Sequence, residues 1–110
     1  MKKFGSTDVW HLCTDLFDLL PIAAVIDQQV LCIHGGLSPD LKTIDEINKL
    51  ERKVELPESG PLCDLMWSDP DDDDTSNWKE SPRGVGFWFG QKQVAEFCHT
   101  NSLKLIARSH

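Results

Sequence analysis

The sequence predicts an α+β fold, because stretches with helical periodicity alternate with short apolar strands along its 110 residues. Helical spacing of apolar residues is found in residues 8–20 and 91–100, and short apolar runs that favour strands occupy residues 22–26, 30–33 and 103–107. About three or four strands are expected, in a sheet with open ends. We therefore expect residues 1–110 to form part of a domain rather than a complete one.

The first third of the chain predicts a helix followed by a β-hairpin. Thr7 or Asp8 can cap the helix, and Pro21 ends it because proline cannot continue the hydrogen-bond ladder. The polar turn of residues 27–29 then joins the two strands of the hairpin. We expect the apolar face of the helix to form one layer with the sheet.

The middle of the chain is less regular. Residues 43–50 predict a helix, since Thr43 and Glu46 have the spacing of a capping box. Residues 56–61 are rich in proline and glycine and are expected to be irregular. Residues 68–84 are polar, acidic and interrupted by prolines, which predicts a long surface loop.

Composition argues against two classes of partner. The formal net charge of −7, without a cluster of lysines, disfavours nucleic acid, whose phosphates need a basic surface. No apolar run approaches the roughly 20 residues of a membrane span, which disfavours a membrane. The N-terminus lacks the apolar core of a signal peptide, so a cytoplasmic or nuclear location is expected.

The four cysteines lie far apart and lack the CxxC spacing of a zinc finger. Cys13, Cys32 and Cys98 lie among apolar residues. We expect reduced, buried thiols that act as small hydrophobic side chains, rather than disulfides.

Two histidines follow predicted strands. His34 comes directly after residues 30–33, and Gly35 and Gly36 behind it allow a sharp turn and a close approach to a ligand. His110 follows the last strand. Each is either an ordinary loop residue or a metal ligand, and a metal would need further ligands because one imidazole cannot hold it alone. The carboxylates that could join them do not close a site by spacing: Asp27, Asp40, Asp64 and Asp69.

An acidic run begins at Asp69. Counted from this residue, oxygen-bearing side chains reach Glu80 at the spacing of an EF-hand loop, which binds Ca²⁺. Against this hypothesis, Asp74 occupies the position that needs glycine, Pro70 is the second residue, and Pro82 prevents the exiting helix. A solvated acidic loop is the favoured interpretation.

Four other side chains could line a ligand site. Arg83, between a proline and a glycine, either binds phosphate with its planar fork or is a surface arginine that pairs with aspartates. Arg108 lies two residues before His110 in an alternating strand and is expected on the same side. Asp69 follows an apolar segment and is the acid best placed to face a cleft, and Trp67 is expected beside it.

Four motifs in sequence cover essentially the whole chain. They are Leu31-Cys32-Ile33-His34-Gly35-Gly36-Leu37-Ser38-Pro39, Cys63-Asp64-Leu65-Met66-Trp67-Ser68-Asp69-Pro70, Ser81-Pro82-Arg83-Gly84-Val85-Gly86-Phe87 and Ile106-Ala107-Arg108-Ser109-His110. This set resembles the phosphoprotein phosphatase family, the metal-dependent protein serine/threonine phosphatases that include phosphatase 1, phosphatase 2A and calcineurin. It is most similar to the phosphatase 2A-like subgroup.

The resemblance implies a fold and a reaction. The fold is part of a calcineurin-like metallophosphatase β-sandwich flanked by helices, and the reaction is hydrolysis of phosphoserine or phosphothreonine by metal-activated water. Full-length members use two divalent metals, Mn, Fe or Zn. By this resemblance the chain supplies two of their ligands, His34 and His110.

The resemblance also assigns roles to the other candidate residues. Arg83 binds the substrate phosphate, and Arg108 is expected to do so with it. Asp69 is the acid beside the metal-bound water. Trp67 belongs to the hydrophobic groove that receives substrate side chains.

The chain lacks three sequence motifs that are found in the family. The family's earlier motifs, Gly-Asp-x-His-Gly, Gly-Asp-x-x-Asp-Arg-Gly and Gly-Asn-His-Glu, are absent; these supply the remaining metal ligands and the group that protonates the leaving oxygen. Two hypotheses follow. The chain is part of a working phosphatase that acts on phosphoproteins and is inactive alone, or it is a catalytically dead module that binds scaffold or regulatory phosphatase subunits.

Overall fold

The computed structural model describes residues 7–52, 55–72 and 77–109. Helices and strands alternate along these ranges, which confirms the predicted α+β class. The elements are α1 (Asp8–Leu19), β1 (Ala23–Ile26), β2 (Val30–Ile33), α2 (Ile44–Asn48), α3 (Pro61–Trp67), β3 (Asp69–Pro70), β4 (Lys79–Glu80), β5 (Phe87–Phe89), α4 (Gln91–Thr100) and β6 (Leu105–Arg108).

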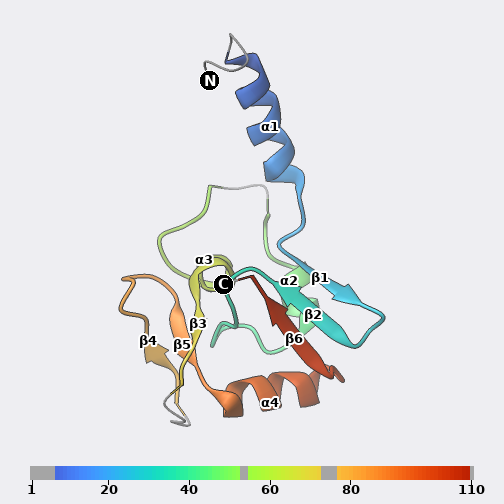
Figure 1. Cartoon of the computed structure of the whole chain (residues 1–110), viewed down its shortest axis with the longest axis vertical. Coiled ribbons are helices and arrows are strands. Elements are labelled where there is room, and N and C mark those ends of the chain that lie inside the picture. Colours follow the sequence, from blue (N-terminus) through green and yellow to red (C-terminus); the bar gives the residue numbers. More distant parts are fainter. Residues whose placement is uncertain (1–6, 53–54, 73–76, 110) are drawn as a thin grey trace.

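The strands form two sheets of three strands each, which stand next to one another in Figure 1. In the first sheet β2 is central, antiparallel to β1 and parallel to β6, with Ile33 opposite Arg108. In the second sheet β5 is central, parallel to β3 and antiparallel to β4. Helix α4 contacts β5 and β6, one strand from each sheet, so it joins the two sheets from below.

The hydrophobic core lies between the sheets and α4. It draws on alternate residues of β2, on the end of β5 and on the inner face of α4, as the apolar periodicity predicts. Its buried members are Leu31, Ile33, Leu37, Leu41, Ile47, Leu65, Phe89, Phe97 and Leu103.

Two local predictions are confirmed in detail. The hairpin turn places Asp27 and Gln28 at φ values of 52° and 56°, the conformation that favours a tight two-strand connection. The Thr43 hydroxyl accepts a hydrogen bond from the Glu46 N–H at 3.2 Å, which caps α2.

The region after residue 60 is more regular than expected. Residues 61–67 form α3, which the sequence pattern did not predict, and the expected loop of residues 68–84 contains β3 and β4. Both strands pair with β5, and Ser68 and Ser81 are buried. The prediction of a surface loop is therefore wrong at its two ends, where the chain pairs with β5; residues 73–76 lie outside the described residues.

The packing predicted for the first helix is also wrong. The helix exists, but none of its residues is buried, and Cys13, expected inside, is exposed. Figure 1 shows α1 standing apart from both sheets. The physical reason is that nothing in the described part of the chain covers its apolar face. All four cysteines are free, as expected.

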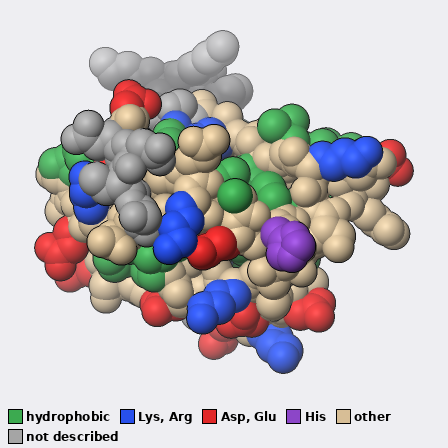
Figure 2. All heavy atoms as spheres, turned by 90° about the horizontal axis from the view of Figure 1, so that it is seen from below, with side chains coloured by type: hydrophobic (Ala, Val, Ile, Leu, Met, Phe, Trp, Pro, Cys, Tyr) green, Lys and Arg blue, Asp and Glu red, His purple; other side chains and the backbone are tan. Residues whose placement is uncertain are grey.

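The face seen from below in Figure 2 carries acidic and basic side chains interspersed. Among the described helices, none is both long and apolar enough to cross a membrane.

Candidate functional site

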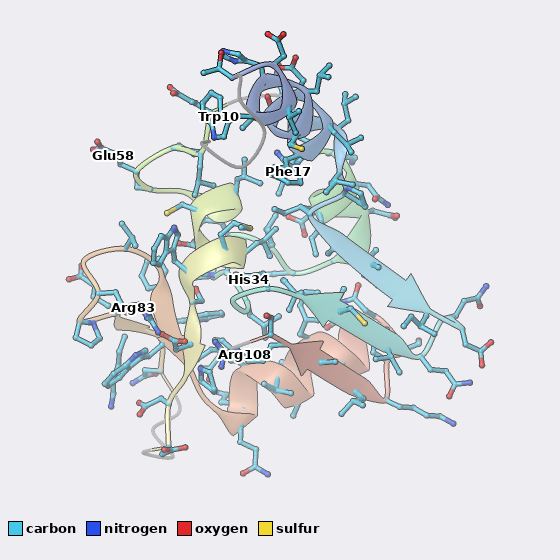
Figure 3. All side chains as sticks on the ribbon, turned by 45° about the horizontal axis from the view of Figure 1, so that its top comes forward. Trp10, Phe17, His34, Glu58, Arg83 and Arg108 are labelled. Atoms are coloured by element: carbon cyan, nitrogen blue, oxygen red, sulfur yellow. The ribbon has the colours of Figure 1, made fainter. Side chains whose placement is uncertain are left out.

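A pocket of about 180 Å³ opens where β2, β6 and the end of α3 meet the strand β3. It brings together five of the six candidate site residues; the sixth, His110, lies outside the described residues. Figure 3 shows His34, Arg83 and Arg108 around this region, each from a different segment. The lining residues are His34, Gly35, Leu56, Met66, Trp67, Ser68, Asp69, Arg83 and Arg108.

The turn after β2 is fixed against the C-terminal end of α3. The Gly35 N–H donates a hydrogen bond to the Leu65 carbonyl oxygen at 2.9 Å. A Cβ at Gly35 would lie 2.5 Å from the carbonyl carbon of Met66, so no side chain fits there. This close approach is what the glycine after His34 permits, and it places His34 at the pocket.

The parallel pairing of β2 with β6 brings the ends of both strands together. The Ser109 N–H donates to the His34 carbonyl oxygen at 3.2 Å, directly beyond the pair of Ile33 and Arg108. As far as Ser109, the two strands therefore end at the same edge of the sheet.

A second set of contacts places the arginine-bearing turn beside Asp69. The Phe87 N–H donates to the buried Ser68 hydroxyl at 3.0 Å. Gly86 has a φ of +74°, and a Cβ there would lie 2.9 Å from the Ser68 backbone nitrogen. Residues 86 and 87 therefore lie directly against the end of α3, and Arg83 in the same turn contacts Asp69 of β3.

Asp69 binds both arginines of the pocket. Its Oδ2 accepts a hydrogen bond from Arg83 Nε at 2.5 Å, and its Oδ1 accepts one from Arg108 Nη2 at 2.7 Å. Arg108 Nε also donates to the Gly35 carbonyl oxygen at 2.6 Å. We call this set the arginine clasp: Arg83, Asp69 and Arg108. It joins the turn after β2, the strand β3 and the loop after β4.

The electrostatics of the clasp favour an anion. Burial acts to raise the pKa of Asp69, but the hydrogen bond and charge of Arg83, with those of Arg108, outweigh burial and hold the pKa below its ordinary value. The carboxylate is therefore ionised at neutral pH. Two guanidinium groups and one carboxylate leave one positive charge in excess, in a chain that is acidic as a whole.

The described residues do not form a metal site by themselves. His34 supplies an imidazole to the pocket, but no group of three or more histidine, cysteine, aspartate or glutamate side chains clusters in the described ranges. A protein metal site for Mn, Fe or Zn needs several such donors. The donor set therefore fits one part of a metal site only.

Two carboxylates of the acidic run bind basic side chains. Asp69, first in the EF-hand spacing, belongs to the clasp, and Asp71, third in that spacing, pairs with Lys79 at 2.9 Å. Both carboxylates are thus occupied by cations of the chain itself. The interpretation against a Ca²⁺ loop agrees with these contacts.

An apolar rim lies beside the clasp. Trp67 lines the pocket and keeps 42% of its surface exposed. Leu56 and Met66 line it too, and sequence reasoning did not select them. Met66 could have been found from its place beside Trp67 in the second motif, whereas Leu56 lies in an irregular stretch without any signal.

Comparison with known proteins agrees with this architecture. The sequence profile of the calcineurin-like phosphoesterases matches residues 1–110. The serine/threonine-protein phosphatase 4 catalytic subunit of Kluyveromyces lactis is 53% identical over 110 residues, which are 100% of this chain and 35% of that protein. The corresponding subunit of Eremothecium gossypii is 51% identical over the same length and the same 35% share.

A solved structure shares the fold. The protein serine/threonine phosphatase from Saccharomyces cerevisiae with similarity to human phosphatase PP5 superposes with a TM-score of 0.83 at 30% identity, over 96% of this chain and 33% of that one. The chain thus spans about a third of the length of the relatives it matches. The chain belongs to the calcineurin-like phosphoesterase family, within its phosphatase 2A-like branch of phosphoprotein phosphatases.

Proposed function

We propose that this chain carries the phosphate-binding part of a metal-dependent protein serine/threonine phosphatase that hydrolyses phosphoserine and phosphothreonine in phosphoproteins. The observation that supports this most strongly is the arginine clasp beside His34 in one pocket. Its relatives are named as catalytic subunits of such phosphatases.

Arg83 is the residue proposed to hold the phosphate. Its Nε is bound by Asp69, and its side chain remains 40% exposed, so its terminal nitrogens can donate charge-assisted hydrogen bonds to phosphate oxygens. Arg108 is less exposed and already donates to Asp69 and Gly35. We propose that Arg108 adds positive charge at the phosphate and fixes Asp69, while Trp67 contacts the apolar part of the substrate.

His34 and His110 are proposed as two ligands of divalent metals, Mn, Fe or Zn. The other ligands would come from the two thirds of the relatives that this chain does not span. Such a metal, when bound, neutralises phosphoryl oxygens and lowers the pKa of water. We propose that the residues of this chain bind and orient the phosphate, and that Asp69 accepts a hydrogen bond from the attacking water.

Calorimetric titration of the chain with a phosphoserine peptide tests the proposal. We expect Arg83→Ala to weaken binding about tenfold or more, since a hydrogen bond to a charged group contributes about 1.5–3 kcal/mol. Lys104→Ala is the matched control, because it removes one positive charge at an exposed position outside the pocket. Equal weakening by both substitutions, or none by Arg83→Ala, would show that the clasp does not bind phosphate.

The second candidate is a catalytically dead module that binds scaffold or regulatory phosphatase subunits. The exposed apolar residues of α1 favour it, because such a surface is typical of a protein contact. It predicts no affinity for the phosphoserine peptide, so the same titration separates the two candidates.

A further inference from the structure

A second pocket lies between α4, the loop after β2 and Trp78, the residue before β4. It encloses about 280 Å³ and is called the α4 pocket. It shares no lining residue with the pocket of the arginine clasp. Figure 1 shows α4 at the end of the molecule opposite α1, so the α4 pocket also lies apart from the exposed apolar residues of that helix. The proposed function therefore leaves this pocket unexplained.

Asn101, at the C-terminal end of α4, holds two walls of the α4 pocket together. Its Nδ2 donates hydrogen bonds to the carbonyl oxygen of Phe97 at 2.8 Å and to that of Lys42 at 2.9 Å. Its Oδ1 accepts a hydrogen bond from the Ile44 N–H at 2.9 Å. Phe97 belongs to α4, whereas Lys42 belongs to the loop after β2. The two walls are thus fixed before a ligand binds, which reduces the entropy that binding costs.

The interior of the α4 pocket is apolar. Leu37 and Leu41 from the loop and Phe97 from α4 line it, and each of them is at most 6% exposed. Trp78 lines it too, and its ring packs against two rings of β5 with centroid separations of 6.2 and 6.4 Å. These four side chains belong to the hydrophobic core or pack against it. The chain therefore forms this pocket from its own core.

The buried polar groups that line the α4 pocket already have partners. The Ser38 hydroxyl donates a hydrogen bond to Asp64 Oδ2 at 2.7 Å, and Gln93 Oε1 accepts one from the Gly90 N–H at 2.7 Å. Both Ser38 and Gln93 are buried. A group that enters the pocket meets apolar surface and polar groups that are already bonded, so the interior suits an apolar side chain.

The rim of the α4 pocket is charged. Glu96 of α4 lines the pocket, and its side chain is 66% exposed, with Lys92 Nζ 3.9 Å from the carboxylate. Asp40 is exposed in the loop that forms another wall. Among the described residues of the rim, these two carboxylates stand against one lysine, Lys42, in a chain whose net charge is −7. Basic side chains are therefore attracted to the rim, and acidic partners are repelled.

We propose that the α4 pocket binds a segment of another protein in which a phenylalanine or leucine side chain is followed by lysine or arginine. The apolar side chain enters the pocket, and the basic side chains contact Glu96 and Asp40. The interaction does not involve the clasp, so it goes beyond the proposed function and holds whether or not the clasp binds phosphate.

Size and charge argue against two other occupants. Pockets for drug-sized ligands enclose about 300–1,000 Å³, so a volume of about 280 Å³ suits a side chain better than a large cofactor. A second copy of the chain would bring the same net charge of −7 to the contact. A basic segment of a different protein has neither constraint.

An NMR titration of the ¹⁵N-labelled 110-residue chain tests the proposal. The probe is the peptide acetyl-Gly-Ser-Phe-Arg-Arg-Gly-amide, and the reporter is the indole N–H signal of Trp78. We expect this signal to shift and to saturate with peptide, while that of Trp10 on α1 stays in place. Peptides with Ala for Phe, or with Glu for both Arg, are expected to bind at least about fivefold more weakly. No shift of Trp78 at millimolar peptide, or equal binding of the three peptides, would overturn the proposal.

Two substitutions locate the contact. Thr100→Trp puts a bulky ring at an exposed position of the lining and is expected to weaken peptide binding at least about tenfold, because the ring competes for the pocket. Glu96→Gln is expected to weaken binding about threefold, since it removes one exposed ion pair. Glu58→Gln is the matched control, because it removes an exposed carboxylate outside the pocket, and it leaves binding unchanged.

The same variants keep this proposal separate from that of the clasp. Neither Thr100 nor Glu96 lines the pocket of the clasp, so both variants are expected to bind the phosphoserine peptide as the unmodified chain does. Undiminished binding of the basic peptide by Thr100→Trp, or equal weakening by Glu96→Gln and Glu58→Gln, would overturn the proposal. So would a chain that is a dimer and whose dilution alone shifts the Trp78 signal, because a second copy would then fill the pocket.

Discussion

At the level of single residues, the candidate site depends on Asp69. The motifs of the sequence select Asp69, Arg83 and Arg108 individually, and all three line one pocket. They do not predict that one carboxylate binds both guanidinium groups. Arg83 and Arg108 lie 14 and 39 positions from Asp69 in the sequence. The pairing of β3 with β5 and of β2 with β6 brings them together. The register of such pairs is not a local property of the sequence.

Asp69→Asn is expected to destabilise the fold at neutral pH and not in acid. Because the folded-state pKa of Asp69 is lowered, its ion pairs stabilise the fold above the ordinary value of 3.8 and are lost as pH falls through the lowered value. The partners are partly exposed, so the cost at neutral pH is about 1 kcal/mol. Urea unfolding of both proteins, at neutral pH and at a pH below the lowered pKa of Asp69, measures this loss of stability. A loss that persists in acid would contradict the explanation.

Asp64→Asn is expected to have the opposite dependence on pH. Asp64 is buried, and burial raises its pKa, while a hydrogen bond from the Ser38 hydroxyl at 2.7 Å opposes this and Asp40 adds to it. The folded state therefore holds the proton more tightly, and stability is lost as pH rises from 3.8 through the raised value.

The neutral amide avoids that loss and keeps an oxygen to accept the Ser38 hydrogen bond. We expect Asp64→Asn to be more stable than the unmodified protein at alkaline pH, by on the order of 1 kcal/mol, and to approach it in acid. Free energies of unfolding across the pH range measure the difference. The raised pKa of Asp64 would be refuted if the free energy of unfolding of the variant, compared with that of the unmodified protein, fell as pH rises.

At the level of elements, the sequence predicts the helices and strands whose apolar residues recur with a clear period. It does not predict the helices and strands that lack such a period. The helix of residues 91–100 and the hairpin of residues 22–33 have the helical and strand periods, and the structure confirms them. Helix α3 is buried at four consecutive positions, residues 62–65, so it has no polar face to mark it as a helix. Strands β3 and β4 have two residues each, too few for alternation to show.

Gly84 and Gly86 lie in the turn that carries Arg83. A substitution at Gly84 tests backbone strain alone, whereas one at Gly86 tests backbone strain together with close packing. Gly84 and Gly86 both have positive φ, at 85° and 74°, but a Cβ at Gly84 would meet open space, whereas one at Gly86 would lie 2.9 Å from Ser68 backbone. Gly84→Ala should cost about 1 kcal/mol for the strained φ. Gly86→Ala should cost about 1–3 kcal/mol more, because the backbone of α3 must move.

Thermal unfolding of the two alanine variants measures their predicted losses of stability, and titration of each variant with the phosphoserine peptide measures its binding. Gly86→Ala is also expected to weaken phosphoserine peptide binding, since it displaces the turn from Asp69. Equal stability of the two variants would mean that the turn does not depend on its contact with α3.

At the level of the whole molecule, the chain is more extended than a compact domain. Its radius of gyration is 15.8 Å, against about 13 Å for a compact domain of this length. Figure 1 shows α1 protruding from the rest of the fold, which extends the molecule. Amphipathic periodicity correctly predicts that α1 is a helix, but the packing expected for it is wrong, because periodicity does not say which surface covers an apolar face.

An incomplete metal site predicts an inactive chain. The isolated 110-residue protein is expected to show no hydrolysis of p-nitrophenyl phosphate with manganese, because its described residues lack a cluster of metal ligands. A colorimetric assay of the released nitrophenol checks this. Turnover that disappears in His34→Ala would show that the chain holds a working site after all.

The central claim, that the arginine clasp binds phosphate, is tested most directly by the arginine side chains themselves. The chain contains three arginines, Arg52, Arg83 and Arg108, and Arg52 lines the hollow beside α1 rather than the pocket. In an NMR titration of the ¹⁵N-labelled chain with a phosphoserine peptide, we predict that the Nε–H signals of Arg83 and Arg108 shift while that of Arg52 stays in place. A shift of Arg52 alone, or no shift of Arg83 at saturating peptide, would contradict the claim.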